Sequence, residues 1–315
     1  MVESGTLNTW NWMSNPKFQS LSLNQLKLVG THDSAAFTFA NLPMPGKISG
    51  KISLSFLELI RRWTIAGIII KDWTLTQSKS FYNQLLAGVR VFDLRIGVTK
   101  KMKCVSSQEL VLSHSFACVR YDVFLFQLKK FILENPSEIV FVTLKHDWVP
   151  KDFFTHDLWE ELFITTLNSI GEYMYPQNAP LGLSIKVKDL QTLNQRILFN
   201  VEEYEIVPPS TKFWSYLLSP FSHYALYFSD SDDGFAQRIK HDIKGRILYP
   251  CFHNIQSLHN LSDNAPEKYH ELQRNKNITS AIWWMDFPTE SLIHTIIQSN
   301  GGQRVDPLLR QKVII

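Results

Sequence analysis

The stretch Leu26-Lys27-Leu28-Val29-Gly30-Thr31-His32-Asp33-Ser34 carries the most informative pattern of this 315-residue chain. Its apolar first half predicts a buried strand, and the glycine that follows predicts a tight turn presenting a His-Asp pair. A histidine at a strand end is a candidate for acid-base chemistry. Each residue also has a structural interpretation: His32 as a hydrogen-bonded core residue, and Asp33 as the cap of a helix beginning at Ser34.

Two further apolar runs end on polar groups of the same kind. Residues 89–96 predict a strand in which Asp93 and Arg95 face one way, because side chains alternate along a strand, while the apolar residues between them face the other. Residues 110–112 predict another strand, which ends at His114. Two histidines and an arginine at strand ends suit acid-base chemistry on a phosphodiester. The Asp93–Arg95 pair alone is also compatible with a plain buried ion pair.

The order of these motifs resembles the X-box of phosphatidylinositol-specific phospholipases C. The matching stretches are Gly30–Ser34, Gln84–Arg95, Leu112–His114 and Asn135–Lys145. The likeness is to the short, metal-independent forms, which are the bacterial phosphatidylinositol phosphodiesterases and the eukaryotic proteins made of an X domain alone. Asn11–Ser14 and Leu75–Gln77 favour the eukaryotic form. The similarity runs from about residue 12 to about residue 300. It implies one α/β domain over residues 1–315, an irregular (β/α)8 barrel of the TIM type.

The resemblance also implies roles for single residues. His32 resembles the general base that takes a proton from the inositol 2-hydroxyl, and Arg95 resembles the phosphate clamp. His114 resembles the general acid for the diacylglycerol oxygen, with Asp33 as its partner. Asp286, at the end of an apolar run, stands where the family keeps the carboxylate that orients the first histidine.

The calcium-dependent relatives hold their metal at positions that here read Asp33, Asp93, Arg95 and Lys145. Two cationic side chains replace the oxygen ligands that Ca²⁺ requires, so we expect neither a metal nor another cofactor. We expect Asp93, Lys145 and Asp147 to contact the head group. For Asp147, a solvated strand end is the alternative.

The composition suits a protein that works at a membrane surface without spanning it. The net charge is +3, the isoelectric point is near 8.6, and 44% of the residues are hydrophobic. A mildly basic chain favours peripheral association with an anionic phospholipid surface and gives no reason to expect nucleic-acid binding or an obligate protein partner. The three cysteines fit no disulfide or zinc spacing, and the N-terminus does not resemble a secretory signal. We therefore expect a cytoplasmic location.

The hydrophobic periodicity predicts alternating strands and helices. Strands are expected near residues 26–31, 89–96, 110–114, 138–144, 196–202, 246–251 and 281–287, with 225–228 as the candidate for an eighth. Helices are expected at 122–134, 157–170 and 292–298, and an aromatic loop from 207 to 223. The apolar segment 48–73 is too short in its uncharged part to span a bilayer. It is either a core helix or a surface that rests on the membrane.

The expected function is the cleavage of phosphatidylinositol-type phospholipids to diacylglycerol and an inositol (cyclic) phosphate. Two other functions stay open: a lipid-binding or scaffold protein without turnover on the same barrel, and a glycerophosphodiester phosphodiesterase. The second normally needs a metal held by a Glu-x-Asp pair, which the Asp93-Leu94-Arg95 stretch lacks.

Overall fold

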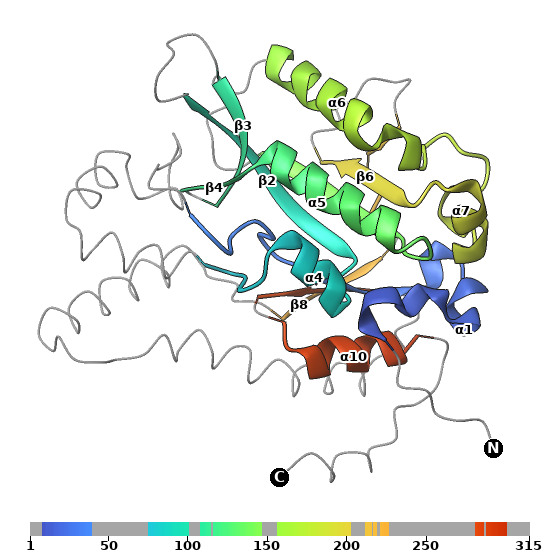
Figure 1. Cartoon of the computed structure of the whole chain (residues 1–315). Helices are drawn as coiled ribbons and strands as arrows, with labels where there is room; N and C mark the ends of the chain where they lie inside the picture. Colours follow the sequence, from blue (N-terminus) through green and yellow to red (C-terminus); the bar gives the residue numbers. More distant parts are fainter. Residues whose placement is uncertain are drawn as a thin grey trace, which may run out of the picture.

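A sheet of parallel strands forms the centre of the molecule (Figure 1). The structure is a computed structural model, and it describes residues 8–39, 75–100, 108–114, 116–146, 156–202, 212–215, 217–218, 221–226, 281–286 and 288–300. Three predictions lie outside these ranges: the strand near 246–251, the segment 48–73 and the side chain of Asp147.

Seven parallel strands follow one another in the order β7-β6-β5-β2-β1-β9-β8 within the described residues. They are β1 (Lys27–Thr31), β2 (Val91–Lys100), β5 (Val140–His146), β6 (Ile197–Val201), β7 (Phe213–Trp214), β8 (Ser222–Leu226) and β9 (Ala281–Met285). The first strand of the chain therefore lies between the second and the last. This order confirms the expected parallel α/β architecture.

The sequence motif that ends at His114 lies on an antiparallel hairpin outside this path. Strand β3 (Gln108–His114) pairs with the second half of β2 and with β4 (Phe116–Arg120). The hairpin forms because β2 has ten residues and extends past β1, so its far half takes another partner. The prediction of a strand ending at His114 is confirmed, but β3 is not one of the parallel strands.

The helices cover the outer side of the sheet. They are α1 (Pro16–Gln19), α4 (Phe81–Ala87), α5 (Tyr121–Glu134), α6 (His156–Ile170), α7 (Val187–Leu193) and α10 (Glu290–Gln298). Single 3₁₀ turns are η1 (Thr9–Ser14), η2 (Leu23–Gln25), η4 (Gly171–Tyr173) and η5 (Gly182–Ser184). In Figure 1, α5 lies between α4 and α6 across the strands. None of the helices in the described ranges is long and apolar enough to cross a bilayer.

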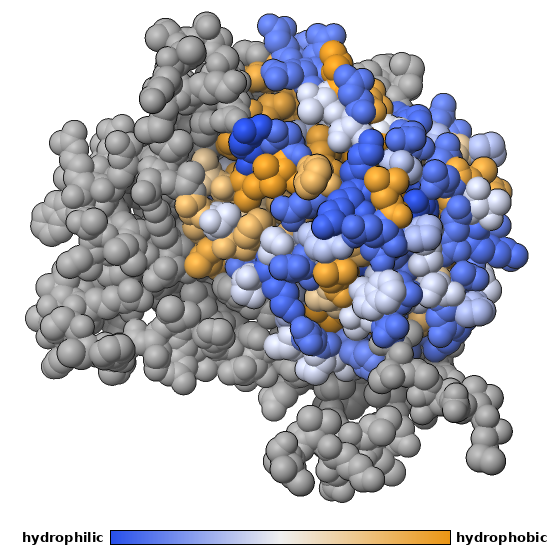
Figure 2. Space-filling view, viewed as in Figure 1, coloured by the Kyte–Doolittle hydropathy of each residue, from blue (hydrophilic) through white to orange (hydrophobic). Residues whose placement is uncertain are grey.

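The apolar row of β2 packs beneath these helices. Phe92, Leu94 and Ile96 are fully buried, as the alternation of the sequence predicts. The rings of Phe92, Phe81 and Phe124 meet edge to face with centroids 4.9 to 5.9 Å apart. This core fixes which face of β2 points inward and so aims Asp93 and Arg95 at the opposite side. Figure 2 shows the mainly polar outer surface of the described helices, with small apolar patches.

A buried ion pair joins the amino ends of β2 and β5. Arg90 and Glu138 are both fully buried, and the Arg90 Nε and Nη2 atoms lie 2.9 and 2.6 Å from Glu138 Oε2. Arg90 also donates to the carbonyls of Leu85, Val89 and Trp10 at 2.7 to 2.8 Å. Because a buried charge is costly unless it is paired and hydrogen-bonded, this complete set of partners makes the pair tolerable at the core.

Candidate active site

The register of three neighbouring strands brings the first set of polar side chains together. Thr31, the last residue of β1, pairs with Phe92 of β2 and Met285 of β9. One residue further along, His32 therefore lies beside Asp93 and Asp286. The His32 backbone N–H donates to the Met285 carbonyl at 3.0 Å, and His32 Nδ1 lies 3.1 Å from Asp286 Oδ1.

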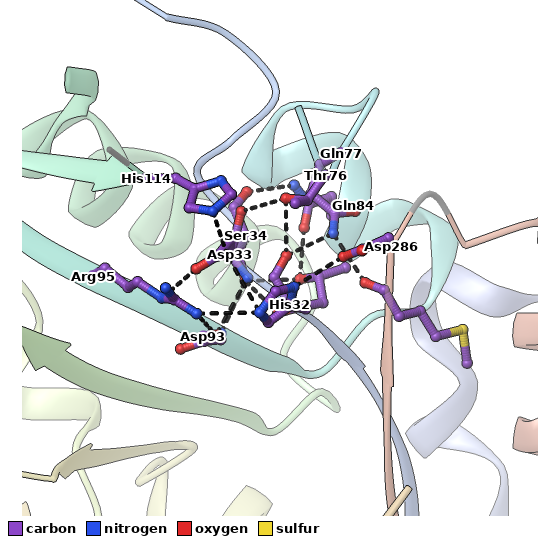
Figure 3. A network of polar contacts seen from close by, with 12 residues as sticks. His32, Asp33, Ser34, Thr76, Gln77, Gln84, Asp93, Arg95, His114 and Asp286 are labelled. Carbon is purple, nitrogen blue, oxygen red and sulfur yellow. Dashed lines mark hydrogen bonds and ion pairs between the residues drawn. The ribbon is translucent and has the colours of Figure 1, made fainter. Parts of the chain in front are cut away.

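Asp33 stands at the centre of the cluster (Figure 3). Its Oδ2 atom lies 3.3 Å from His32 Nε2 and 3.2 Å from His114 Nε2, and its Oδ1 atom contacts Arg95 Nε. Its φ of 42° is in the left-handed region, inside a turn that spans residues 32–37, so Asp33 does not cap a helix. Its backbone N–H points at Asp93 Oδ2 at 3.3 Å. The Asp33 carboxylate thus contacts both histidines and the arginine.

The two imidazoles and the guanidinium are partly exposed, whereas the carboxylate between them is buried. The ring centroids of His32 and His114 are 6.5 Å apart, and Arg95 Nη2 lies 3.1 Å from His32 Nε2. The side chains of His32, Arg95 and His114 are 14 to 21% exposed, whereas that of Asp33 is 1% exposed. A ligand can therefore reach the three nitrogen-bearing groups without uncovering the carboxylate that holds them.

A second row of polar side chains lies one step further along the strands. Arg95 of β2 pairs in register with Lys145 of β5, whose Nζ lies 3.0 Å from Asp93 Oδ1. Glu202 follows β6 directly, its backbone N–H donates to the carbonyl of Leu144, and its side chain accepts from the Thr143 hydroxyl at 3.3 Å. Sequence reasoning missed Glu202, although the alternation of β6 places it on the same side of the strand as Asn200.

Charge and burial set the protonation of the cluster. Burial alone lowers the pKa of His32, but the Asp33 carboxylate and the hydrogen bond to Asp286 outweigh it and raise that pKa to about 9. Burial raises the pKa of Asp33, yet Arg95 and the histidines hold that pKa well below its usual range. Burial is also the main reason that the pKa of Asp286 is raised. His32 and Asp33 are therefore both charged at neutral pH in this state.

Asp93 and Lys145 also shift the pKa of one another. Burial raises the pKa of Asp93, but Lys145 and then Arg95 pull it below its usual value. Burial lowers the pKa of Lys145, and Asp93 together with Glu202 raises it above its usual value against the repulsion of Arg95. Asp93 and Lys145 therefore form a charged pair beside the histidines.

Among the described residues, His32, Asp33 and Asp93 are spaced as a metal site requires, with one ligand atom from each within 4.8 Å of the others. The donor set does not fit a cation. Arg95 contacts Asp33, Lys145 contacts Asp93, and the raised pKa keeps His32 protonated, whereas a metal needs a neutral imidazole and available oxygens. Arg95 and Lys145 supply positive charge at the place where an ion would supply it.

Comparisons with known proteins show which sequences and structures this chain resembles. No family model matches the chain. It is 27% identical over 188 residues to mouse PI-PLC X domain-containing protein 3, covering 58% of this chain and 56% of that protein. It is also 27% identical over 138 residues to human PI-PLC X domain-containing protein 2, covering 43% of each. Over these stretches the chain is similar to PI-PLC X domain-containing proteins. It spans about half the length of the curated relatives it matches.

Solved structures of bacterial phosphatidylinositol-specific phospholipases C share the fold of this chain. The enzyme of Listeria monocytogenes superimposes with a TM-score of 0.56 at 21% identity, over 93% of this chain and 99% of that one. A Staphylococcus aureus structure, from work on the modulation of its membrane binding, gives a TM-score of 0.55 at 14% identity, over 93% and 98%. These likenesses establish the TIM-barrel-like α/β fold.

Most of the site residues predicted from the sequence lie close together in the structure. The structure brings together His32, Asp33, Asp93, Arg95, His114, Lys145 and Asp286. Two residues near the cluster were missed as functional candidates. Thr76 and Gln77 entered the sequence argument only as a mark of resemblance, yet both donate to carbonyl groups of the loop that carries His32.

Proposed function

We propose that this chain is a phosphodiesterase of the phosphatidylinositol-specific phospholipase C type. Its substrate is a phosphatidylinositol-type phospholipid, and its products are diacylglycerol and an inositol (cyclic) phosphate. The convergence of His32, Arg95 and His114 on the Asp33 carboxylate carries the proposal, because a base, an acid and a phosphate-binding cation are the groups that this reaction needs.

The first step is an internal attack on phosphorus. His32 takes the proton of the inositol 2-hydroxyl while the hydroxyl oxygen bonds to the phosphorus. Because the nucleophile is tethered to the phosphate, its positioning supplies much of the acceleration. The contact with Asp286 at 3.1 Å keeps the His32 ring in one orientation and stabilises the imidazolium that forms. Only the neutral imidazole accepts this proton, so the raised pKa of His32 makes the active form a minority species at pH 7.

The second part of the step is the departure of the glycerol oxygen. The bond between phosphorus and the diacylglycerol oxygen breaks as His114 donates its proton to that oxygen, and Asp33 Oδ2, 3.2 Å from His114 Nε2, holds the ring in place. Arg95 binds the non-bridging oxygens, where charge gathers in the transition state. A slower attack by water, with the two histidines in exchanged roles, opens the cyclic phosphate.

The remaining polar side chains are assigned to the head group and the membrane. Asp93, Lys145 and Asp147 are the proposed contacts of the inositol ring. The partly exposed Lys145, which pairs with Asp93 and lies in register with Arg95, supports this for the first two. We assign the chain a peripheral place at a cytoplasmic phospholipid surface. The membrane binding named for the Staphylococcus aureus structure supports that assignment by analogy.

One assay tests the function. The protein is incubated with phosphatidylinositol vesicles in excess chelator, and diacylglycerol is measured. The wild type releases diacylglycerol, and His32→Ala and His114→Ala release none above background. His294→Ala, on the outer helix α10, is the matched control and keeps wild-type activity. Failure to release diacylglycerol from any phospholipid overturns the proposal and favours a binding protein without turnover.

A further inference from the structure

The structure points to Gln77 as a positioning residue: we infer that its side-chain amide holds the ends of β1 and β9 together so that His32 meets Asp286 in the reactive orientation. This inference rests on the role of His32 proposed above. Gln77 touches no reacting group itself, and it acts through the backbone of the two residues that do.

The contacts of Gln77 form a closed ring with the two strand ends. Its Nε2 donates to the His32 carbonyl at 2.8 Å and to the Met285 carbonyl at 3.0 Å. The Met285 carbonyl also accepts from the His32 backbone N–H at 3.0 Å. The two amide hydrogens are therefore donated to one carbonyl each, that of His32 just after β1 and that of Met285 at the end of β9. The ring ties residue 32 to the residue directly before Asp286, and Gln77 is 2% exposed, so water does not compete for these bonds.

Gln77 binds at the place where the two strands end. Strands β1 and β9 end at Thr31 and Met285. The Met285 carbonyl already accepts from the His32 N–H, and the Thr76 hydroxyl lies 3.1 Å from the His32 carbonyl, so Gln77 adds a second donor to each and links the two. It does so at the point where the chain turns the His32 and Asp286 side chains toward each other (Figure 3).

Neighbours of Gln77 hold the rest of the loop. The Thr76 hydroxyl lies 3.1 and 3.0 Å from the carbonyls of His32 and Asp33. The backbone N–H groups of Thr76 and Gln77 both donate to the carbonyl of Ala36, at 3.0 and 3.1 Å. Gln84 donates to the Ser34 carbonyl at 2.9 Å and accepts from the Thr31 hydroxyl at 2.8 Å. Thr76, Gln77 and Gln84 together thus contact the carbonyls of four turn residues, His32, Asp33, Ser34 and Ala36.

Loss of the Gln77 amide would loosen one contact more than the others. The groups facing His32 are Asp33 from its own loop, Asp93 and Arg95 from β2, His114 from β3 and Asp286 after β9. Only the contact to Asp286 spans the two strand ends that Gln77 joins. A change at Gln77 should therefore weaken the His32–Asp286 hydrogen bond while Arg95 keeps its pairing with Asp33.

The test compares two glutamines that make the same kind of bridge. Gln191 Nε2 also joins two carbonyls, those of Met13 and Ser137 at 3.2 and 2.7 Å, but near the amino ends of the strands. Gln77→Met and Gln191→Met both remove a bridging amide at nearly constant volume. Each variant is assayed for kcat and KM on phosphatidylinositol vesicles, and the titration of His32 is followed by NMR.

We expect Gln77→Met to lower kcat about 10- to 100-fold with little change in KM, because a misplaced base slows the chemical step more than binding. We also expect the His32 pKa to fall below its wild-type value. Gln191→Met should lose comparable stability and keep both the wild-type kcat and the wild-type titration. A wild-type kcat and titration in Gln77→Met overturn the inference, and so do equal changes in the two variants.

Two provisions keep the test decisive. If Gln77→Met does not fold, Thr76→Val takes its place, because it removes the hydroxyl that lies at the carbonyls of His32 and Asp33. We expect Thr76→Val to lower kcat and the His32 pKa, as Gln77→Met would. An unchanged His32 titration in Thr76→Val then overturns the inference. Should the wild type release no diacylglycerol, the proposed function fails, and the NMR titration of His32 in Gln77→Met alone supports or overturns the positional role.

Discussion

Replacing Asp33 with asparagine removes the charge at the centre of the cluster while keeping its shape. Asparagine tolerates a positive φ, so the backbone at 42° is not strained by the change, as it would be by most other residues. The variant therefore isolates the electrostatic effect of one carboxylate on His32, Arg95 and His114.

The expected magnitude follows from the His32 pKa. Its rise from 6.5 to about 9 corresponds to about 3 kcal/mol of preference for the charged imidazole, and Asp33 is the largest of the groups that raise it. Removing an opposite charge at this distance lowers such a pKa by about 1 to 3 pH units. Because the folded pKa is the higher one, the stabilisation is complete below pH 6.5 and is lost as the pH rises through 9. Asp33→Asn should therefore be most destabilising at low pH.

Two measurements check this result. NMR titration of His32 gives the pKa directly, and urea unfolding at pH 6 and pH 10 gives the pH dependence of stability. We also expect kcat/KM on phosphatidylinositol to fall about 10²- to 10⁴-fold, because His114 and Arg95 lose the carboxylate that holds them in place. Asp122→Asn, which removes an exposed carboxylate paired with Arg120 on α5, is the control. An unchanged His32 titration in Asp33→Asn would refute the electrostatic reasoning.

Three further results are expected. Arg90→Met leaves the Glu138 charge buried without its partner and should lower the free energy of unfolding by about 3 to 5 kcal/mol, measured by urea titration. In the control, Lys130→Met removes the half-exposed ion pair of Lys130 with Glu134 and should lower that free energy by less than about 0.5 kcal/mol. If His32 is the base, kcat/KM should rise with pH up to about 9, and a plateau already reached at pH 7 contradicts that role. Activity should be equal with and without excess chelator, because Arg95 supplies the positive charge; loss in chelator that Ca²⁺ restores would reject this.

The sequence predicted best what depends on local alternation. The apolar row of β2 follows from period-two patterning, and so does the direction of Asp93 and Arg95, opposite to that row. The helices at 122–134, 157–170 and 292–298 begin and end within two residues of α5, α6 and α10. The candidate eighth strand at 225–228 overlaps β8. The strand pair formed by β1 and β9 explains why a histidine near the start of the chain meets an aspartate 254 residues later.

The features that sequence reasoning missed depend on tertiary contacts. Strand β4 was not predicted, and it forms by pairing with β3 in a hairpin. Strand β7 has only two residues, too few for a period to be counted, and it lies inside the stretch predicted to be a loop. Asp33, whose φ is positive, has its carbonyl next to the hydroxyl of Thr76, 43 positions away in the chain. Gln77 and Glu202 are polar residues without a motif of their own. Their partners become visible only when the ends of the strands are placed side by side.

The arrangement of β1 between β2 and β9 has a consequence for the making of the protein. When translation has reached residue 280, the nascent chain contains His32, His114 and Arg95. It does not yet contain Met285 or Asp286. The nascent polypeptide then carries an imidazole whose orienting acid does not yet exist, beside an uncovered edge of β1. The group of side chains around His32 would therefore be complete only late in synthesis.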